Sequence, residues 1–478
     1  MRLGWIAVVG GVLGGGAFAT TAAAQVRTLQ EALAAAYANN PQIQAARAQL
    51  RSTDENVPQA LAGWRPTVIL SGGGGYAAGT YGTATAGTIT PGLATTLGGG
   101  TRTVRTNRPI AQGSATLTQP LYRGGQTAAS THQATNQVYA QRARLMATEQ
   151  QVFLDTISAY VGVIQAEQIN QLNQNNKQVL AKQLQATQDR FRVGEITRTD
   201  VAQAEAALAG ASAQVETSQG NLQTARATYV RTVGEFPQPD LAKPQPLRLP
   251  LKSEKEASQL AAANNPTVIA AQFDEASSKD AIDVAFSQLM PQVSLQAQAL
   301  RQDNITLPDT SILGAQVLAN VSIPLYQGGA EYARIRQARQ NRQQARRLVD
   351  DAKRTAIQNA TQSWETLVAA RSTIESTRAQ IRANQVALEG VEREAIVGSR
   401  TTLDVLNAQQ ALLNSQATLV QNLANLITAS YSVASSIGRL TARDLNLNVP
   451  LYDDTAYYRA VRDRLFGTGD FATGQPGR

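Results

Sequence analysis

The chain has 478 residues, only 5% of them aromatic, and contains no Cys. The low aromatic content favours thin helical layers over one thick core, and the absence of Cys excludes disulfides, thiolate chemistry and a lipidated Cys. The formal net charge of +8 is small for this length, and Lys and Arg are scattered among Gln and Glu, so nucleic-acid binding is not expected.

The first 24 residues are typical of a secretory signal peptide. Arg2 provides a short positive region, residues 3–18 are apolar and rich in Gly, and small residues lead up to Ala24. We predict cleavage after Ala24, with Ala19 as the alternative site. A membrane anchor is disfavoured because the apolar run is short and interrupted by Gly. No later apolar run has the length of a transmembrane helix, so any membrane-spanning part would have to consist of strands.

The rest of the chain contains one unit twice. The sequence Pro-Leu-Tyr-x-Gly-Gly begins at Pro120 and again at Pro324, and Val-Gly begins at Val193 and again at Val397. Both pairs are 204 residues apart (324 − 120 and 397 − 193), which predicts two copies of a large structural unit. The predicted division is a signal peptide at 1–24, a first repeat at 25–233, a Pro-rich linker at 234–253 that is neither helix nor central strand, a second repeat at 254–437, and a tail at 438–478.

Two short helices are predicted at the start of each copy. In the first copy they cover residues 28–39 and about 42–62, and in the second copy about 254–264 and 267–288. An Asn-Asn-Pro sequence divides each pair, because Pro disfavours a helical conformation in the residue before it.

A β-hairpin is predicted after these helices in each copy. Apolar and polar residues alternate after Pro66 and Pro291, and again before each Pro-Leu-Tyr sequence. The hairpins are expected at about 66–121 and about 291–326. Four strands with one apolar face cannot close a barrel alone, but the strands of several subunits could.

The tip of the first hairpin is longer than that of the second. The Asn-Pro sequences lie 225 residues apart (266 − 41), so the first copy holds 21 extra residues (225 − 204) before its Pro-Leu-Tyr sequence. This tip, roughly residues 80–111, carries Arg102, Arg105 and Arg108 and is expected to be a loop. Two interpretations are open, contact with anionic lipid headgroups or a solvated polar loop.

A long helix is predicted after each hairpin. Residues 126–193 and 330–397 each contain no Pro over 68 residues, and at ~1.5 Å per residue each would be a rod of about 100 Å. Each rod ends at its Val-Gly sequence, and a shorter helix then returns, at about 201–233 or 405–437.

The first long helix has the spacing of a coiled-coil seam. Its apolar residues recur at intervals of three and four, with one phase skip. A run rich in Gln and Asn, residues 165–178, is interpreted as a wetted surface. The expected seam consists of Phe153, Ile157, Tyr160, Ile164, Ile169, Leu172, Asn176 and Val179.

Together these features make residues 28–447 resemble the TolC-type outer-membrane efflux and secretion proteins. The resemblance rests on Asn-Pro near the start of each copy, Pro-Leu-Tyr-x-Gly-Gly at each strand-to-helix junction, and two turn motifs. The first turn is Arg-Phe-x-Val-Gly followed by Asp-Val, at 190–201, and the second is Val-Gly followed by Asp-Val-Leu, at 397–406. It implies a mainly α fold with a membrane β-barrel. The assembly would be a homotrimer whose four strands per chain close a twelve-stranded barrel, continued by a long α-helical periplasmic tunnel.

The resemblance also implies a location and partners. The location is the outer membrane of a Gram-negative bacterium, with most of the chain in the periplasm. The partners are outer-membrane lipid, a periplasmic adaptor (membrane fusion) protein, and an inner-membrane pump of the ABC or RND type that supplies the energy. No cofactor, metal or nucleic acid is expected.

The resemblance assigns the closed tunnel entrance to the turns after the long helices, at Asp200, Arg400, Asp404 and Asn407. A carboxylate and a guanidinium there can form a charge-assisted pair between neighbouring hairpins, and three copies of Asp404 around an axis would favour cations. The alternative is that Asp200 and Asp404 only cap the return helices, and both roles are compatible. Ala395 stands where the family has a gating Tyr and Asn407 where it has a second ring Asp, which predicts a weaker gate and a less acidic ring.

Two further sets of residues follow from the resemblance. Adaptor docking is assigned to Val193, Gly194, Val397 and Gly398, although each Gly is explained equally well as a helix terminator. The strand-to-helix junctions are assigned to Pro120, Gly124, Gly125, Pro324, Gly328 and Gly329.

The function predicted from the sequence is that of a passive exit duct in a tripartite export machine. Type I protein secretion is favoured, because no lipidation Cys follows the signal peptide and the tail at 449–459 resembles that of secretion-type members. The alternative is the outer-membrane factor of a multidrug efflux pump. A structural coiled coil that spans the envelope, or an adhesin, would explain the long helices but not the hairpins. An enzyme is not expected, because the one His, His132, has no paired acid in a recognisable motif.

Overall fold

The computed structural model describes residues 27–84, 101–305, 309–469 and 471. The predicted signal peptide and residues 85–100 of the first hairpin tip lie outside the described residues. The chain forms two compact units, and both contain segments from each sequence repeat, so the predicted repeat boundaries stay a prediction. Among the described residues, the first unit comprises 27–36, 156–245 and 381–424, and the second comprises 37–84, 101–155, 246–305, 309–380, 425–469 and 471.

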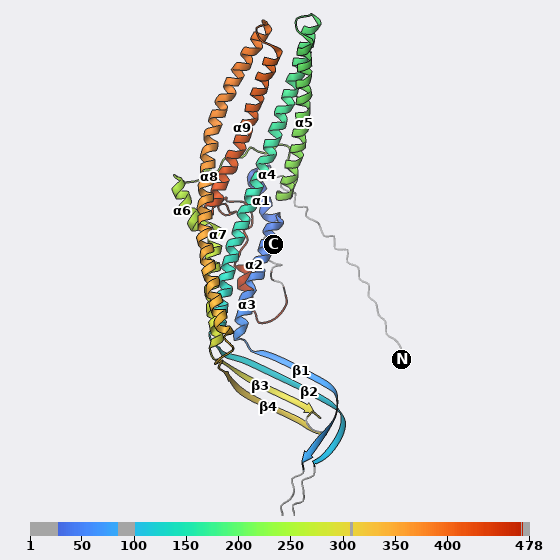
Figure 1. Ribbon diagram of the computed structural model, residues 1–478, viewed down its shortest axis with the longest axis vertical. Helices are drawn as coiled ribbons and strands as arrows, with labels where there is room; N and C mark the ends of the chain where they lie inside the picture. The colour runs from blue at the N-terminus through green and yellow to red at the C-terminus, as the bar shows by residue number, and fades with distance from the viewer. Residues whose placement is uncertain (1–26, 85–100, 306–308, 470, 472–478) are drawn as a thin grey trace, which may run out of the picture. The chain divides into compact units, whose positions relative to one another are not determined.

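The same succession of helices and strands occurs twice along the chain (Figure 1). No helix among the described residues is both long and apolar enough to cross a bilayer. The first series is α1 (Leu29–Asn39), α2 (Pro41–Asp54), α3 (Asn56–Leu61), the 3-10 helix η1 (Ala62–Trp64), β1 (Thr67–Ala84), β2 (Thr101–Arg123), α4 (Gln126–Arg192) and α5 (Arg198–Val233). The second is α6 (Glu254–Asn264), α7 (Pro266–Phe286), η2 (Ser287–Leu289), β3 (Gln292–Asp303), β4 (Ser311–Ser322), α8 (Ala330–Ile396) and α9 (Thr402–Ser436), and the tail contains α10 (Ala456–Val461).

The Asn-Pro sequences form the boundaries between the short helices. The Asn40 side chain accepts a hydrogen bond from the backbone N–H of Gln42 (2.9 Å), and Asn265 does the same for Thr267 (3.0 Å). Each following Pro occupies the first helical turn, where its missing N–H costs no hydrogen bond. The same residue pair therefore ends one helix and begins the next in both copies.

The single helix expected at about 42–62 is wrong, because the structure divides it into α2 and α3 at Glu55. Pro58 explains the break, since it has no N–H to donate to the carbonyl of Asp54 and its ring crowds that carbonyl. The second copy has no Pro at this point, and α7 continues for 21 residues.

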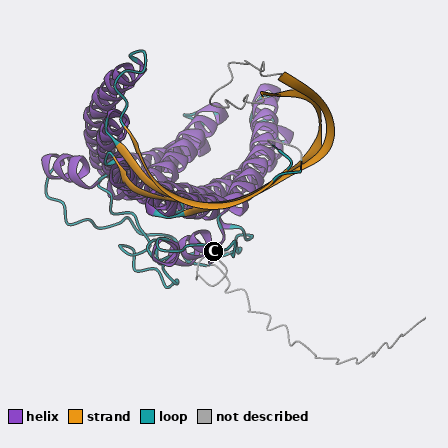
Figure 2. Ribbon diagram, turned by 90° about the horizontal axis from the view of Figure 1, so that it is seen from below, coloured by secondary structure: helices purple, strands orange, loops and turns teal. Residues whose placement is uncertain are grey.

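The described strands form one antiparallel sheet in the order β1-β2-β3-β4, and the sheet is strongly curved (Figure 2). Its register aligns the predicted apolar residues on one face, with Val68 opposite Leu117, Leu117 opposite Ala297, and Ala297 opposite Val317. The other face is mostly polar and carries hydrogen-bonded side-chain pairs between neighbouring strands. The predicted alternation is thus confirmed. The side-chain pairs of the polar face are Ser71–Ser114, Gln298–Gln316 and Gln296–Asn320.

The predicted basic loop is wrong for residues 101–111, which continue β2 and pair with β1. Arg102, Arg105 and Arg108 therefore belong to a strand. The guanidinium of Arg108 donates to the carbonyls of Asn304 (2.6 Å) and Ile305 (3.0 Å) in the turn after β3. This cation is committed to the backbone of the second hairpin, because the extra residues of the first hairpin extend its strands beyond that turn.

Helices α4 and α8 each have 67 residues and confirm the two predicted rods. In α4, Phe153, Ile157 and Tyr160 are fully buried, as the seam predicts. Further along, Val179 is 43% exposed and the neighbouring Leu180 is buried instead, so the seam is wrong at that residue. A straight helix rotates slowly away from a strict three-four repeat, which moves the buried stripe to the next residue.

The run at 165–178 is not uniformly wetted, because Asn173 and Asn176 are only 6% and 8% exposed. Their side chains line a cavity of about 450 Å³ together with small residues of α5, Ala207 and Gly210, and with residues of α9. A polar cavity of this size can hold water. These two amides therefore line a cavity between helices rather than an open wetted surface.

Within the second unit, the tail packs on α2 through a buried arginine. Arg47 is 1% exposed and its guanidinium lies 4.5 Å from the ring centre of Tyr37 and 5.1 Å from that of Tyr452. A guanidinium between two aromatic faces is held by cation–π attraction. This contact fixes the tail segment that leads to α10.

Candidate functional site

Both long helices end in the same hydrogen-bonded turn. After α4, the N–H of Gly194 donates to the carbonyl of Phe191 (2.9 Å) and that of Glu195 to Arg190 (3.0 Å). After α8, the N–H of Gly398 donates to the carbonyl of Ala395 (3.3 Å) and that of Ser399 to Glu394 (3.0 Å). Gly194 and Gly398 have φ of 81° and 79°, a left-handed conformation that disfavours side chains. The interpretation of both glycines as helix terminators is confirmed.

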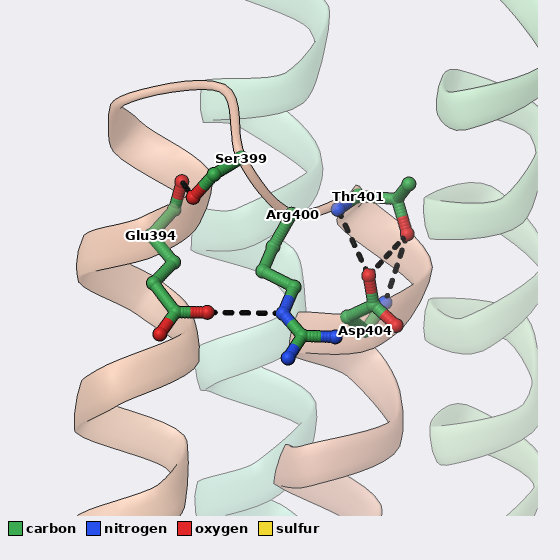
Figure 3. A network of polar contacts seen from close by, with 5 residues as sticks. All are labelled: Glu394, Ser399, Arg400, Thr401 and Asp404. Carbon is green, nitrogen blue, oxygen red and sulfur yellow. Dashed lines mark hydrogen bonds and ion pairs between the residues drawn. The ribbon is translucent and has the colours of Figure 1, made fainter.

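Both return helices begin with a capping box. The backbone N–H of Asp200 donates to Thr197 Oγ1 (3.3 Å), and the Asp200 carboxylate accepts from the N–H of Thr197 (3.0 Å). Thr401 and Asp404 repeat the arrangement at 3.3 and 3.0 Å (Figure 3). The Thr197 hydroxyl and N–H hold the pKa of Asp200 below its usual value, and the N–H and hydroxyl of Thr401 do so for Asp404. The capping role is therefore confirmed for both carboxylates, which are held in their charged form.

Each tip also has an arginine–glutamate ion pair, with the two charges exchanged between the copies. In the first tip, Arg190 at the end of α4 pairs with Glu195 in the turn (2.7 Å). In the second, Glu394 at the matching position (190 + 204) pairs with Arg400 (2.9 Å), as Figure 3 shows. The same Arg190 nitrogen joins the two tips, because Nη2 also donates to the carbonyl of Ala395 in the second tip (3.5 Å). Alternating charge makes the tips complementary when they stand side by side.

Large apolar side chains surround these polar turns. Val193 is 79% exposed, Ile396 76% and Val397 78%. Phe191 and Leu403 are a little under half exposed. Apolar groups this exposed at one end of a helical hairpin are typical of a contact surface.

The structure separates the predicted entrance residues into two groups. Arg400 and Asp404 both lie in the second tip. The hydrogen bond and charge of Glu394 raise the pKa of Arg400, and the charge of Asp404 adds to this shift. Asp200 belongs to the first tip, where the nearby cation is Arg190. Asn407 is exposed, one helical turn after Asp404.

Five residues of the tips were not predicted from the sequence: the ion-pair partners Arg190, Glu195 and Glu394, and the capping residues Thr197 and Thr401. The capping residues had a detectable signal, because Thr three residues before Asp is the sequence pattern of a capping box. The ion pairs had none, since the two copies share no pattern there: Arg190 aligns with Glu394, but Glu195 aligns with Ser399 and Arg400 with Ile196.

The strand-to-helix junctions contain paired left-handed glycines in both copies. Gly124 and Gly125 have φ of 63° and 83°, and Gly328 and Gly329 have 73° and 84°. Pro120 lies within β2 beside a break in its register with β3, whereas Pro324 follows the end of β4. Both copies share the Pro-Leu-Tyr-x-Gly-Gly sequence, but only in the first copy does its Pro-Leu-Tyr part belong to a strand. The described residues contain no group of three His, Cys, Asp or Glu side chains that could hold a metal ion.

Comparison with known proteins agrees with this geometry. The model of the outer membrane efflux protein family matches residues 30–235 and 257–439. The chain belongs to the outer membrane efflux protein family. Outer membrane efflux protein BepC of Brucella suis is 35% identical over 461 residues, 96% of each chain.

Other relatives of this efflux-family chain are more distant. Outer membrane protein TolC of Escherichia coli is 28% identical over 312 residues, 62% of this chain and 63% of its own length. A crystal structure of CusC has a TM-score of 0.73 over 87% of this chain and 92% of its own at 14% identity, and it shows the shared fold. The family resemblance and outer-membrane location predicted from the sequence are confirmed, and the helical part lies in the periplasm.

Proposed function

We propose that this efflux-family chain is one subunit of a trimeric exit duct through the outer membrane, driven by a partner pump. The observation that carries the proposal is the sheet. Within the described residues β1 pairs only with β2 and β4 only with β3, so both outer strands keep unpaired backbone groups. In a membrane such groups need partners, and pairing β4 of one subunit with β1 of the next would satisfy them and close twelve strands around an axis.

The two faces of the sheet support this arrangement. Val68, Leu70 and Val317 on the apolar face are 72%, 83% and 67% exposed, which is unfavourable in water and suits hydrocarbon. The polar face, with its Gln, Ser and Thr side chains, would line the lumen. A closed sheet with these faces is a channel rather than a structural stalk or adhesin.

The helix tips would form the periplasmic entrance. Six tips meet around the axis of a trimer, and the exchanged ion pairs let each cationic turn approach an anionic one. Arg400 and Asp404 would form the narrow part, and Asp200 would support the neighbouring tip. The exposed Val193 and Val397 would then bind the periplasmic adaptor, beside the glycines Gly194 and Gly398 that shape the turns.

Two cargo classes have support. The name of the Brucella relative, an efflux protein aligned over nearly the whole chain, favours export of small molecules by a multidrug efflux pump. The tail and the absence of Cys favour type I protein secretion. Isolation of the assembled complex from envelope membranes distinguishes them, because an RND-type pump in the complex supports efflux and an ABC transporter supports secretion.

Conductance through planar bilayers tests the duct itself. We expect the purified trimer to insert and to form discrete cation-preferring pores, because the polar face and the ring of Asp404 would line the path. Protein denatured before insertion is the control. Insertion without conductance would contradict the proposal and favour a structural protein.

Arg400→Ala tests the entrance. We expect a severalfold increase in closed-state conductance, because the variant loses the cation that pairs with Glu394 and that would face the neighbouring tip in the proposed trimer. Arg192→Ala is a matched control, since Arg192 is an exposed cation of the first tip whose partner, Asp189, lies on its own helix. An equal increase in both variants, or none in either, would leave only the capping role for the tip.

A further inference from the structure

The last described part of the tail is folded around one arginine. Arg464 Nε donates to the carbonyl of Phe466 (3.1 Å), and Nη1 donates to that of Gly469 (2.8 Å). Its guanidinium lies 4.5 Å from the ring centre of Phe471. Residues 464–469 and Phe471, named here the terminal loop, therefore have a shape defined by a central cation.

The terminal loop is attached where the sheet begins. Arg65 Nη1 donates to the carbonyl of Arg464 (2.7 Å), and Arg65 lies two residues before β1. The carbonyl of Trp64 accepts from Gln119, whose register places it on the apolar face of the sheet with Leu117 and Leu295. The terminal loop thus lies at the end of the sheet where β1 begins, next to the apolar face of the sheet.

Two apolar side chains of the terminal loop are largely exposed. Phe466 is 88% exposed and Leu465 is 71% exposed, and the nearby Trp64 is 43% exposed. Full burial of each such side chain is worth about 1.5–3 kcal/mol, so exposing them to water is costly. The hydrogen bonds of Arg464 fix the backbone that carries these side chains. A loop exposed only to water would have polar residues such as Ser or Lys at these positions.

Other residues at this end of the sheet have the chemistry of a membrane–water interface. Tyr122 and Tyr326 of the two Pro-Leu-Tyr sequences are 46% and 78% exposed. In membrane proteins Tyr and Trp are enriched at the membrane–water interface, because their rings are apolar and their tips are polar. The exposed Arg459 and Arg462, which precede the terminal loop, complement anionic headgroups.

We propose that the terminal loop and Trp64 form an interfacial anchor that inserts Leu465 and Phe466 into the periplasmic leaflet of the outer membrane. Lipid is the occupant because the loop continues the apolar face of the sheet and stands beside aromatic and cationic residues. The anchor would fix the depth of the sheet in the bilayer from the tail, in addition to the strands themselves. It goes beyond the proposed duct but rests on the assignment of the apolar face to lipid.

The Cys-free sequence allows a direct test by single spin labels. Phe466→Cys places a label on the terminal loop, and Leu70→Cys places one on the apolar face as the lipid reference. Phe236→Cys is the matched control, because Phe236 is 80% exposed but lies in the Pro-rich linker. The full-length labelled proteins are reconstituted in vesicles of phosphatidylethanolamine and phosphatidylglycerol, and collision with oxygen, which partitions into lipid, is compared with collision with a water-soluble nickel chelate.

We expect oxygen to dominate at 70 and 466, with a shallower depth at 466, and the nickel chelate to dominate at 236. A chelate-dominated signal at 466 with a lipid signal at 70 would overturn the anchor and leave the duct intact. An immobile label at 466 that neither reagent reaches would also overturn it, because a neighbouring subunit would then cover the loop. A chelate-dominated signal at 70 would overturn the lipid-facing assignment and the anchor together.

Discussion

Replacement of Gly124 by Ala is expected to prevent most of the chain from reaching its folded state. Gly124 has φ of 63°, which costs a non-Gly residue about 1–2 kcal/mol. An added Cβ would also lie 2.7 Å from the carbonyl oxygen of Ser287 and in hard contact with the Cβ of Met290, both held at the end of η2. Because backbone must move to relieve this contact, we expect a total cost of at least ~3 kcal/mol. The amount of folded protein in outer membranes and its thermal midpoint measure the effect.

Gly125→Ala is the matched control for this prediction. Gly125 has φ of 83°, but nothing lies within 4 Å of its added Cβ. Its cost is therefore limited to the backbone strain of about 1–2 kcal/mol. If Gly124→Ala were no more harmful than Gly125→Ala, the close packing of the junction against η2 would be wrong.

The second junction differs from the first in a way that supports assembly. Gly328, which matches Gly124, has nothing within 4 Å of its added Cβ. In the first junction the covering residues are 287–290 of the second copy, and their equivalents in the first copy are 62–65 (287 − 225 and 290 − 225). Six equivalent units around an axis would place residues 62–65 of the next subunit against Gly328. The trimer that we propose would thus complete a contact that one chain makes only once.

The element order was predictable because its signals are local. The ends of α4 and α8 were predicted to within one residue, since a long stretch without Pro stops at a Val-Gly sequence in both copies. The capping roles of Asp200 and Asp404 were also accessible, because each depends on a residue three positions away. Alternation placed the correct residues on the apolar face of the sheet.

The remaining differences depend on tertiary contacts. Arg108 was assigned to a loop, because composition does not show that β2 extends beyond the turn after β3. The guanidinium of Arg108 donates to two backbone carbonyls of that turn. Asn173 was expected in water, but it is buried and lines the cavity between α4, α5 and α9. Asn176, which belongs to the expected seam, is buried as that seam predicts. The gate between subunits and the adaptor surface remain proposals, because both form only between chains.

Asp54, the last residue of α2, is expected to make the stability of the folded chain depend on pH. It is fully buried, and neither of its carboxylate oxygens accepts a hydrogen bond from the described residues. Burial raises its pKa to about 7; Arg142 opposes the shift, Asp454 and Glu55 add to it, and Arg51 opposes it. The folded protein therefore binds this proton more tightly than the unfolded chain. The stability contribution is fully present below pH ~4 and is lost as pH rises through about 7.

Asp54→Asn is expected to remove this loss. An amide stays neutral at every pH, so the free energy of unfolding at pH 8 should rise by up to ~4 kcal/mol and change little at pH 4. Thermal midpoints followed by circular dichroism from pH 4 to 8 measure the difference, with Asp350→Asn as the control because that carboxylate is half exposed. Parallel pH profiles for the wild-type chain and Asp54→Asn would contradict the prediction. A profile that flattens only in Asp54→Asn would identify this carboxyl as the group that makes the helical part less stable at neutral pH, at the place where the tail and α4 meet α2.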